Sequence, residues 1–445
     1  EEVPAIHNDN DSVVINATVN NWGGYAEAIG LDRSSLDTGI GNDDIKINAR
    51  TDGANTNAWA MRDSDIDTGS GGDHLSINAN STISSYSSSG NNAGATGIED
   101  SSIKTGLSND QLNINVNANA RYYYSQSSEA EAVGVEGSSI DTGSGDDNLS
   151  INLNATASGY SKSGNAGTVG VEGSSLDTGT GNDNLNINAY ANSSARYYYS
   201  RSSEAEAIGV EGSNIDTGSG EDLLNINATA RSYNSRSSEA EAVGVEGSNI
   251  DTGSGDDRVN INASASASSN GSSSDVEAIG IEGSHVDTGS GDDHLNINAS
   301  ADDNGGRHQD YSEAIGVEGS SIDTGSGDDR LNINASANGH YWGSTEAYGA
   351  LKTNIETGSG NDYTRINATA DIIGAKAKAI GLGHNSSLET SHGNDHVDIN
   401  ASANSSVVSR YNRSEAEAVG VEDSSIDTGS GDDHVNINAH ADGTN

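Results

Sequence analysis

Apolar and polar residues alternate along most of this chain, and the alternation changes phase at regular points. In Glu129-Ala130-Glu131-Ala132 the alanines share one face of an extended chain and the glutamates share the other. The next apolar residues, in Val133-Gly134-Val135, have the opposite parity, which predicts a bend or bulge between Ala132 and Val133. Because no apolar stripe of helical period occurs, the pattern predicts short β-strands separated by bends.

Two sharper bends complete one unit of this pattern. A second change of parity predicts a corner at Glu136-Gly137. The two glycines between Thr142 and Asp146 predict a tight turn. After the turn, the alternating apolar residues of 149–153 are expected to point inward and Asn152 outward.

The unit is repeated along the whole chain. The phrase Asp141-Thr142-Gly143-Ser144-Gly145-Asp146-Asp147-Asn148-Leu149-Ser150-Ile151-Asn152 returns thirteen times, at intervals of 30 to 39 residues. Segments between units, such as Ser158 to Gly167 and Ser266 to Ser274, contain few apolar residues and are expected to be loops of variable length. We therefore predict an all-β fold, a single elongated parallel β-solenoid of about 12 to 13 coils, with three or four short strands and a variable loop in each.

The repeat also defines the expected domain organisation. Residues 1–445 form one solenoid domain, with an N-terminal partial coil or leader at 1–17, a repeat array at 18–439 and a C-terminal tail at 440–445. The first and last copies of the phrase lie close to the two ends, with no charged or helical cap. Open solenoid ends expose unpaired strand edges, so they are expected to pair head to tail.

Stacking turns repeated acids into columns of acids. One column is aspartate in every copy: Asp11, Asp43, Asp73, Asp110, Asp147, Asp183, Asp222, Asp257, Asp293, Asp329, Asp362, Asp395 and Asp433. A second column, interrupted by Lys104, contains Asp37, Asp67, Asp141, Asp177, Asp216, Asp251, Asp287, Asp323, Glu356, Glu389 and Asp427.

Stacked carboxylates need compensation. Neighbouring coils are ~4.8 Å apart, and two unscreened carboxylates at that distance repel by about 3.5 kcal/mol at an effective dielectric constant near 20. Ca²⁺ resolves such a conflict because it accepts six to eight oxygen ligands in flexible geometry, whereas Mg²⁺ requires a tighter octahedron. The aspartates of both columns are therefore candidate calcium ligands. The alternative is that these segments are solvated Asp-Gly turns.

The turn also resembles a known motif. Thr142-Gly143-Ser144-Gly145-Asp146-Asp147-Asn148-Leu149 is similar to the RTX nonapeptide G-G-x-G-x-D-x-U-x, with threonine at the first glycine. The resemblance covers nearly the whole chain and implies that the thirteen aspartates of the first column, with turn carbonyls, bind calcium between coils. RTX proteins have two nonapeptides in each short coil. Here each long coil has one, so one row of calcium ions is expected.

Two repeats depart from the motif. The third, Lys104 to Asp110, has lost the fourth glycine and gained a lysine whose ammonium group could replace one ion. The eleventh contains Ser391 and His392 in the turn. The asparagine that follows the isoleucine is present in all thirteen copies, and we expect these asparagines to form a hydrogen-bonded amide ladder, although several also lie in glycosylation sequons.

Composition excludes several classes of function. The net charge of −47 argues against binding to nucleic acid or to an anionic membrane surface. No apolar stretch approaches transmembrane length. Without cysteine, the chain has neither disulfides nor cysteine-ligated metal sites. Calcium levels favour the outside of a cell, so we expect an extracellular or cell-surface location.

These observations favour a structural protein, a calcium-stiffened rod that assembles with copies of itself into a filament, sheath or surface layer. The repeat style is similar to that of calcium-binding surface-fibril proteins of the oscillin type. An adhesin stalk that binds glycans is the alternative, suggested by the tyrosine-rich segments 121–124 and 196–199. The basic residues Lys352, Lys376 and Lys378 could dock against acidic columns of a neighbour. Ice binding is disfavoured because serine and aspartate occupy the relevant turn positions, and a polysaccharide lyase or epimerase is the least favoured reading because no catalytic cluster stands out.

Overall fold

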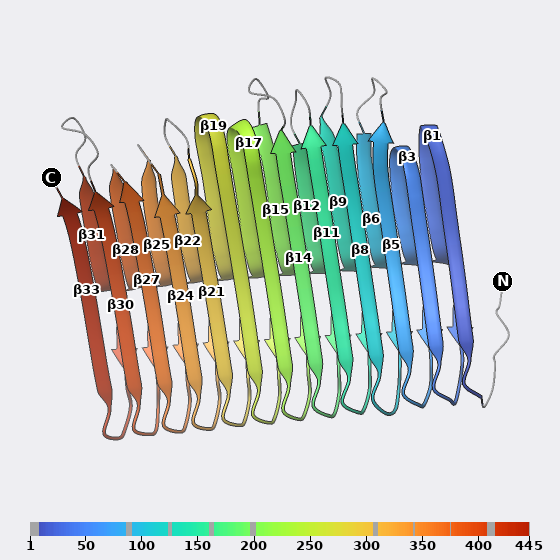
Figure 1. The fold of residues 1–445 in the computed structure, drawn as a ribbon. Coiled ribbons are helices and arrows are strands. Elements are labelled where there is room, and N and C mark those ends of the chain that lie inside the picture. The colour runs from blue at the N-terminus through green and yellow to red at the C-terminus, as the bar shows by residue number, and fades with distance from the viewer. Residues whose placement is uncertain are drawn as a thin grey trace.

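A computed structural model describes residues 9–85, 91–122, 127–159, 164–195, 202–305, 310–340, 343–373, 375–406 and 414–444. These residues form a stack of β-coils, in which the ends of the first strands lie along one edge and the turns lie along the other (Figure 1). The predicted all-β parallel solenoid is confirmed. No described residue is helical.

Each coil contains three strands in a fixed order. The first strand follows the turn and runs away from it, the second returns, and a third strand of three residues leads from the corner to the next turn. In four coils the first and second strands are continuous: β1 (Ser12–Asp32), β3 (Asp44–Arg62), β17 (Leu223–Glu246) and β19 (Arg258–Glu282). The other first strands are β5 (His74–Ser85), β8 (Gln111–Tyr122), β11 (Asn148–Gly159), β14 (Asn184–Ala195), β21 (His294–Asp303), β24 (Arg330–Gly339), β27 (Tyr363–Ile373), β30 (His396–Ser406) and β33 (His434–Thr444).

The remaining strands belong to the return path and to the corner. The second strands are β6 (Asn91–Glu99), β9 (Ser128–Glu136), β12 (Gly164–Glu172), β15 (Ser202–Glu211), β22 (Tyr311–Glu318), β25 (Ser344–Leu351), β28 (Lys376–Gly383) and β31 (Glu415–Glu422). The third strands are β2 (Ser35–Asp37), β4 (Asp65–Asp67), β7 (Ser102–Lys104), β10 (Ser139–Asp141), β13 (Ser175–Asp177), β16 (Asn214–Asp216), β18 (Asn249–Asp251), β20 (His285–Asp287), β23 (Ser321–Asp323), β26 (Asn354–Glu356), β29 (Ser387–Glu389) and β32 (Ser425–Asp427).

Identical residues stack because every pairing is parallel and in register. Ile151 of β11 pairs with Ile114 of β8 and with Ile187 of β14, and the same register continues along the array. The first and second strands form one sheet of 21 strands, and the third strands form another of twelve. The core between them consists of columns of buried leucine, isoleucine, valine and alanine. It is thin, and its stability comes from repetition along the stack.

The three predicted bends occur where the parity changes. Ala132 to Val135 are four consecutive buried residues, and the β12–β9 register passes from Val133 to Val135 without Gly134. A side chain at Gly134 would meet the carbonyl oxygen of Gly170 in the next coil, so the bulge requires glycine. The corner lies at Gly137, with φ 56°. The turn contains Gly143 and Gly145, with φ 88° and 139°.

One expectation needs correction. Ser266–Ser274 lies within β19 and is not a loop. Backbone pairing with β17 continues through most of this segment, because such pairing does not depend on apolar side chains. At the N-terminal end of the array, residues 12–17 belong to β1 and pair with β3. At the other end, residues 440–444 belong to β33 and pair with β30.

The predicted asparagine ladder is present along the whole stack. In each coil the side-chain Nδ2 donates a hydrogen bond to Oδ1 of the matching asparagine in the preceding coil, over distances of 2.7 to 3.3 Å. The ladder joins Asn16, Asn48, Asn78, Asn115, Asn152, Asn188, Asn227, Asn262, Asn298, Asn334, Asn367, Asn400 and Asn438. Its side chains are half-buried, so each amide bond also stiffens the stack.

Candidate cation-binding column

The thirteen aspartates of the first column form a second continuous ladder. The backbone N–H of each donates to Oδ1 of the aspartate in the following coil, as Asp147 does to Asp183 over 2.8 Å. Twelve such bonds, all between 2.7 and 3.1 Å, join the column from Asp11 to Asp433. The carboxylate therefore has a structural role that explains its place directly after the turn, where the backbone N–H has no strand partner.

The second oxygen of these carboxylates lies in the interior. From Asp43 to Asp395 the column is at most 3% exposed, and Oδ2 is a buried atom without a hydrogen-bond partner in eleven of the thirteen aspartates. At Asp362 the hydroxyl of Thr357 donates to Oδ2 over 2.9 Å. A buried carboxylate oxygen without a donor is unfavourable unless the group binds a proton or a cation.

Burial dominates the titration of the column. It raises the pKa of Asp110, Asp183, Asp257 and Asp329 to about 7, while the N–H bond from the preceding aspartate lowers it. The charges of stacked aspartates raise it further. Burial likewise raises the pKa of Asp293 to about 6. These five aspartates are therefore held close to their proton-binding range at neutral pH when no cation compensates them.

A column of buried threonines accompanies the aspartates, and the sequence analysis did not identify it. Thr142 is 1% exposed, and its hydroxyl donates to the carbonyl oxygen of Thr178 in the next coil over 3.2 Å. The same contact recurs from Thr68 to Thr390, over 3.1 to 3.4 Å, except at Thr357, which donates to Asp362. The threonine hydroxyl also lies beside the aspartate of its own coil and lowers the pKa of that carboxyl, as Thr142 does for Asp147. Its one proton serves either the carbonyl or the carboxylate, and its oxygen is an additional acceptor next to the aspartate.

The second predicted column lies on the outer surface of the coil, whereas the first lies in its interior. In β10 the middle residue Ile140 is buried, whereas Asp141 is half-exposed, so Asp141 points outward while Asp147 points inward. The same holds for the other third strands, and the outward acids accept local N–H bonds, as Asp287 does from Gly289 over 2.9 Å. Acids of the two predicted columns therefore do not converge on a shared ion.

Lys104 belongs to the outer column. It pairs in register with Asp67 and Asp141, as predicted, and is exposed, whereas Asp110 of the same repeat is buried in the inner column. The two unusual turns keep a positive φ at the altered positions. Ser108, at the position of Gly145, has φ 85°, where the matching glycines have 134° to 153°, and Ser391, at the position of Gly143, has φ 60°.

A third row of side chains follows the outer surface of the turn. Asp146 accepts the backbone N–H of Asn182 through Oδ1 over 2.9 Å, and Asn182 in turn accepts that of Glu221 over 2.8 Å. Asparagine and aspartate alternate freely in this row, since both offer the required oxygen. The inner column contains only aspartate. The second terminal atom of each side chain in the inner column must therefore be an acceptor, and the NH₂ group of asparagine is not one.

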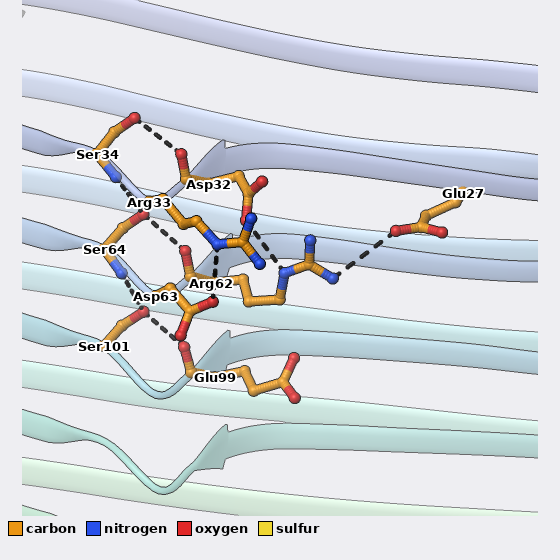
Figure 2. A network of polar contacts seen from close by, with 9 residues as sticks. All are labelled: Glu27, Asp32, Arg33, Ser34, Arg62, Asp63, Ser64, Glu99 and Ser101. Carbon is orange, nitrogen blue, oxygen red and sulfur yellow. Dashed lines mark hydrogen bonds and ion pairs between the residues drawn. The ribbon is translucent and has the colours of Figure 1, made fainter. Parts of the chain in front are cut away.

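The corner has its own ladder, which Figure 2 shows in the first coils. Each corner serine donates its hydroxyl to the carbonyl two residues earlier and accepts the backbone N–H of the serine in the preceding coil. Ser64, for example, donates to Arg62 over 2.7 Å and accepts from Ser34 over 3.1 Å. Ser101 repeats the arrangement one coil later.

Acids at the corner are compensated differently from those in the turn. Arg62 lies in the glutamate column of the corner and contacts Asp32 at 3.1 Å and Glu27 at 3.7 Å, and Arg33 contacts Asp63 at 3.5 Å (Figure 2). These groups are at least partly exposed. In the middle coils, Glu136, Glu172 and Glu246 lie beside other acids of the corner, and partial burial together with these charges raises their pKa. The partly exposed ion pairs of Arg33 and Arg62 contribute little to stability.

The predicted basic region is largely engaged within its own chain. Lys352 donates to Glu318 over 2.8 Å. Lys378 stacks between Glu346 and Glu417 in the sheet register, and its ammonium group lies 5.4 Å from the centre of the Tyr348 ring. Tyr123, Tyr124 and the segment 196–199 lie outside the described residues.

The inner column offers a donor set that fits calcium. It contains only oxygens: aspartate carboxylates on successive coils, with threonine hydroxyl and carbonyl oxygens beside them. Within the described ranges no three histidine, aspartate or glutamate side chains surround one point. Each ion would therefore be held by stacked aspartates and neutral oxygens. The stacked aspartates extend along the full length of the array.

Comparisons with protein-family models, with curated proteins and with solved structures found no match for this chain. Within the described residues, no helix is long and apolar enough to cross a membrane.

Proposed function

We propose that this protein is a structural, non-enzymatic rod, a β-solenoid that Ca²⁺ stiffens and that assembles with copies of itself outside the cell. The observation that carries the proposal is the unbroken column of buried aspartates. Its Oδ1 atoms bind the stack together, and its Oδ2 atoms require a compensating charge. A divalent cation supplies that charge and couples neighbouring coils.

The ladders support a mechanical role. Aspartate, asparagine, threonine and corner serine side chains each bond from coil to coil, so bending the rod requires many hydrogen bonds to be broken together. Rows of this kind keep the cross-section constant and resist shear between coils. A surface with the same features in every coil suits a spacer or a filament subunit.

The polarity of the ladders supports end-to-end assembly. At β33 the core positions Val435 and Ile437 are 42% and 47% exposed, and at β1 the core positions Val13 and Ile15 are only partly buried. Each terminal asparagine of the ladder makes one ladder bond. Asn438 uses Nδ2 and leaves Oδ1 to accept, while Asn16 uses Oδ1 and leaves Nδ2 to donate. Asn16 of a following copy can donate to Asn438, so one more coil-to-coil step continues the ladder without reversing it.

The proposal is tested with the full chain in millimolar calcium and in EDTA. We expect sedimentation and electron microscopy to show end-to-end polymers in calcium that Ile437→Lys abolishes, because a charge then faces the apolar end of the stack. Asn436→Lys, on the outer face of the same strand, is the control and leaves polymers intact. Unassociated rods in calcium, or equal polymers with Ile437→Lys, would contradict assembly.

A further inference from the structure

Two buried aspartates lie far from the turn, at the edge where first and second strands meet. Asp303 is the last residue of β21 and Asp310 immediately precedes β22. Each is 3% exposed. This edge, uppermost in Figure 1, is opposite the turns that contain the aspartate column. The repeated motif therefore does not account for these residues.

In most other coils both positions have small side chains, and Ile83 is a larger exception in the first strands. In the register of the first strands, the column that ends at Asp303 contains Ala120, Ala157, Ser193, Ser232 and Ala267. In the second strands, the column that leads to Asp310 contains Ser128, Gly164, Ser203, Ser238 and Ser274. One coil thus places two carboxylates where its neighbours place alanine and serine.

The two carboxylates meet at a single serine. The hydroxyl of Ser274 donates to Oδ1 of Asp303, and the backbone N–H of Ser274 donates to Oδ1 of Asp310 over 3.0 Å. The backbone N–H of Gly305 also donates to Oδ1 of Asp303, over 3.2 Å. Ser274 is 1% exposed, so both acids are held close together away from solvent.

Two buried oxygens at this edge lack partners. Oδ2 of Asp303 has no hydrogen-bond partner, and neither does the hydroxyl of Ser269, a residue that is 7% exposed. Ser269 matches Ser235 in the register, and Ser235 lies 2.9 Å from Ser238, the residue that matches Ser274. Ser269 is therefore on the same side as Ser274. In that preceding coil serine hydroxyls bond to one another, whereas here they surround carboxylates.

Burial dominates the titration of Asp303. It raises the pKa of this carboxyl, while hydrogen bonds from Ser274, Gly305 and His340 and the charge of His340 lower it. A buried carboxylate that has one oxygen without a donor is unfavourable unless a proton or a cation compensates it.

We propose that Asp303 and Asp310 bind one Ca²⁺ ion, with the hydroxyls of Ser269 and Ser274 beside it, at a site that occurs once among the residues the structure describes. The donors are oxygens only, which favours a hard cation over zinc or copper. Such an ion would fasten the edge of β21 to that of β22 near the middle of the array. This inference is independent of the proposed calcium row, because the two sites lie at opposite edges of the coil.

The test is hydrogen exchange measured by mass spectrometry on the full chain, in EDTA and across a calcium titration. We expect calcium to slow exchange of the peptides that contain residues 294–305 and 310–318. At a calcium concentration ten times Kd, exchange through local opening slows about 11-fold. The double variant D303A/D310S places in this coil the residues that the preceding coil has at these positions, so it should fold, and it should lose the effect.

Asp302→Ser provides the matched control. Asp302 neighbours Asp303 on the outer face, and serine is its counterpart in the preceding coil. The control should keep the calcium effect. Wild-type peptides that do not respond to calcium, or a double variant that responds like the wild type, would overturn the site and indicate that the acids share a proton. Peptides of the turns near Asp293 and Asp329 report the proposed calcium row separately, so either site can fail alone.

Discussion

The turn and the corner are the two sharp bends of every coil, and they tolerate very different changes. At the corner, the left-handed position is glycine in the middle coils but Arg33, Asp63, Asp100, Lys352, His384 and Asp423 elsewhere, with φ between 46° and 57°. In the turn, the position of Gly145 is glycine in every repeat except those with Asp9 and Ser108. Acids line both bends, yet only those of the turn never vary. The positions that vary least between repeats are therefore those that are buried or in close contact with the next coil, and charge alone does not prevent variation.

Glycine contacts explain the first part of this contrast. A side chain at Gly220 in the turn would collide with the carbonyl oxygen of Gly181 in the preceding coil, whereas a side chain at Gly212 in the corner would meet nothing within 4 Å. Burial explains the second part. Corner acids are partly exposed to solvent, while the inner aspartates are buried beside one another.

The largest expected effect is on pH dependence, because pH acts on every coil. Burial raises the pKa of inner aspartates such as Asp183 and Asp257 to about 7 from an ordinary value of 3.8. Their protonated form favours the folded state, so this stabilisation is complete below about pH 4 and is lost as pH rises through 7. In EDTA we expect a higher melting temperature at pH 5 than at pH 8, and a smaller difference in calcium.

Salt separates this effect from the repulsion among surface acids. At 1 M salt the Debye length is about 3 Å, which screens the corner and outer columns but not the buried one. The difference between pH 5 and pH 8 should therefore persist in 1 M NaCl. A melting temperature in EDTA that is equal or higher at pH 8 would contradict the description of the inner column.

The next effect concerns the glycines of the two bends. Gly220→Ala introduces a clash with backbone at φ 143°, and we expect the free energy of unfolding to fall by about 3 kcal/mol or more. Gly212→Ala at φ 54° should lower the free energy of unfolding by about 1 kcal/mol, because alanine meets no neighbour there and only the cost of the left-handed backbone conformation applies. Urea unfolding measures both. Equal losses would show that the turn is no more tightly packed than the corner.

A smaller effect is expected from single acids. Asp222→Ala removes the acceptor for the backbone N–H of Asp183, and a buried unsatisfied donor costs about 1 to 3 kcal/mol. Glu211→Ala in the corner column should change the free energy of unfolding by no more than about 0.5 kcal/mol. Both variants are compared in calcium by urea unfolding. A corner variant as damaging as the turn variant would remove the distinction between buried and exposed acids.

The sequence predicted the features that parity and repetition determine. The bulge at Gly134, the corner at Gly137, the turn and the asparagine ladder all follow from alternation and fixed spacing. The repeat pattern did not separate the two acid columns. Asp141 and Asp147 face opposite sides of the coil because the turn lies between them, and alternation does not extend through a turn. The repeat pattern also missed Asp303 and Asp310, since two acids in a variable segment look like ordinary surface residues until the register places them inside.

The most direct test of the account is the number of calcium ions bound per chain, measured by equilibrium dialysis together with the melting temperature. The account predicts several ions per chain, of the order of the stacked aspartate pairs, and a marked fall in melting temperature in EDTA, since each site at a hundred times its Kd contributes about 2.7 kcal/mol. A chain that binds no calcium above background and melts at the same temperature in EDTA would contradict it.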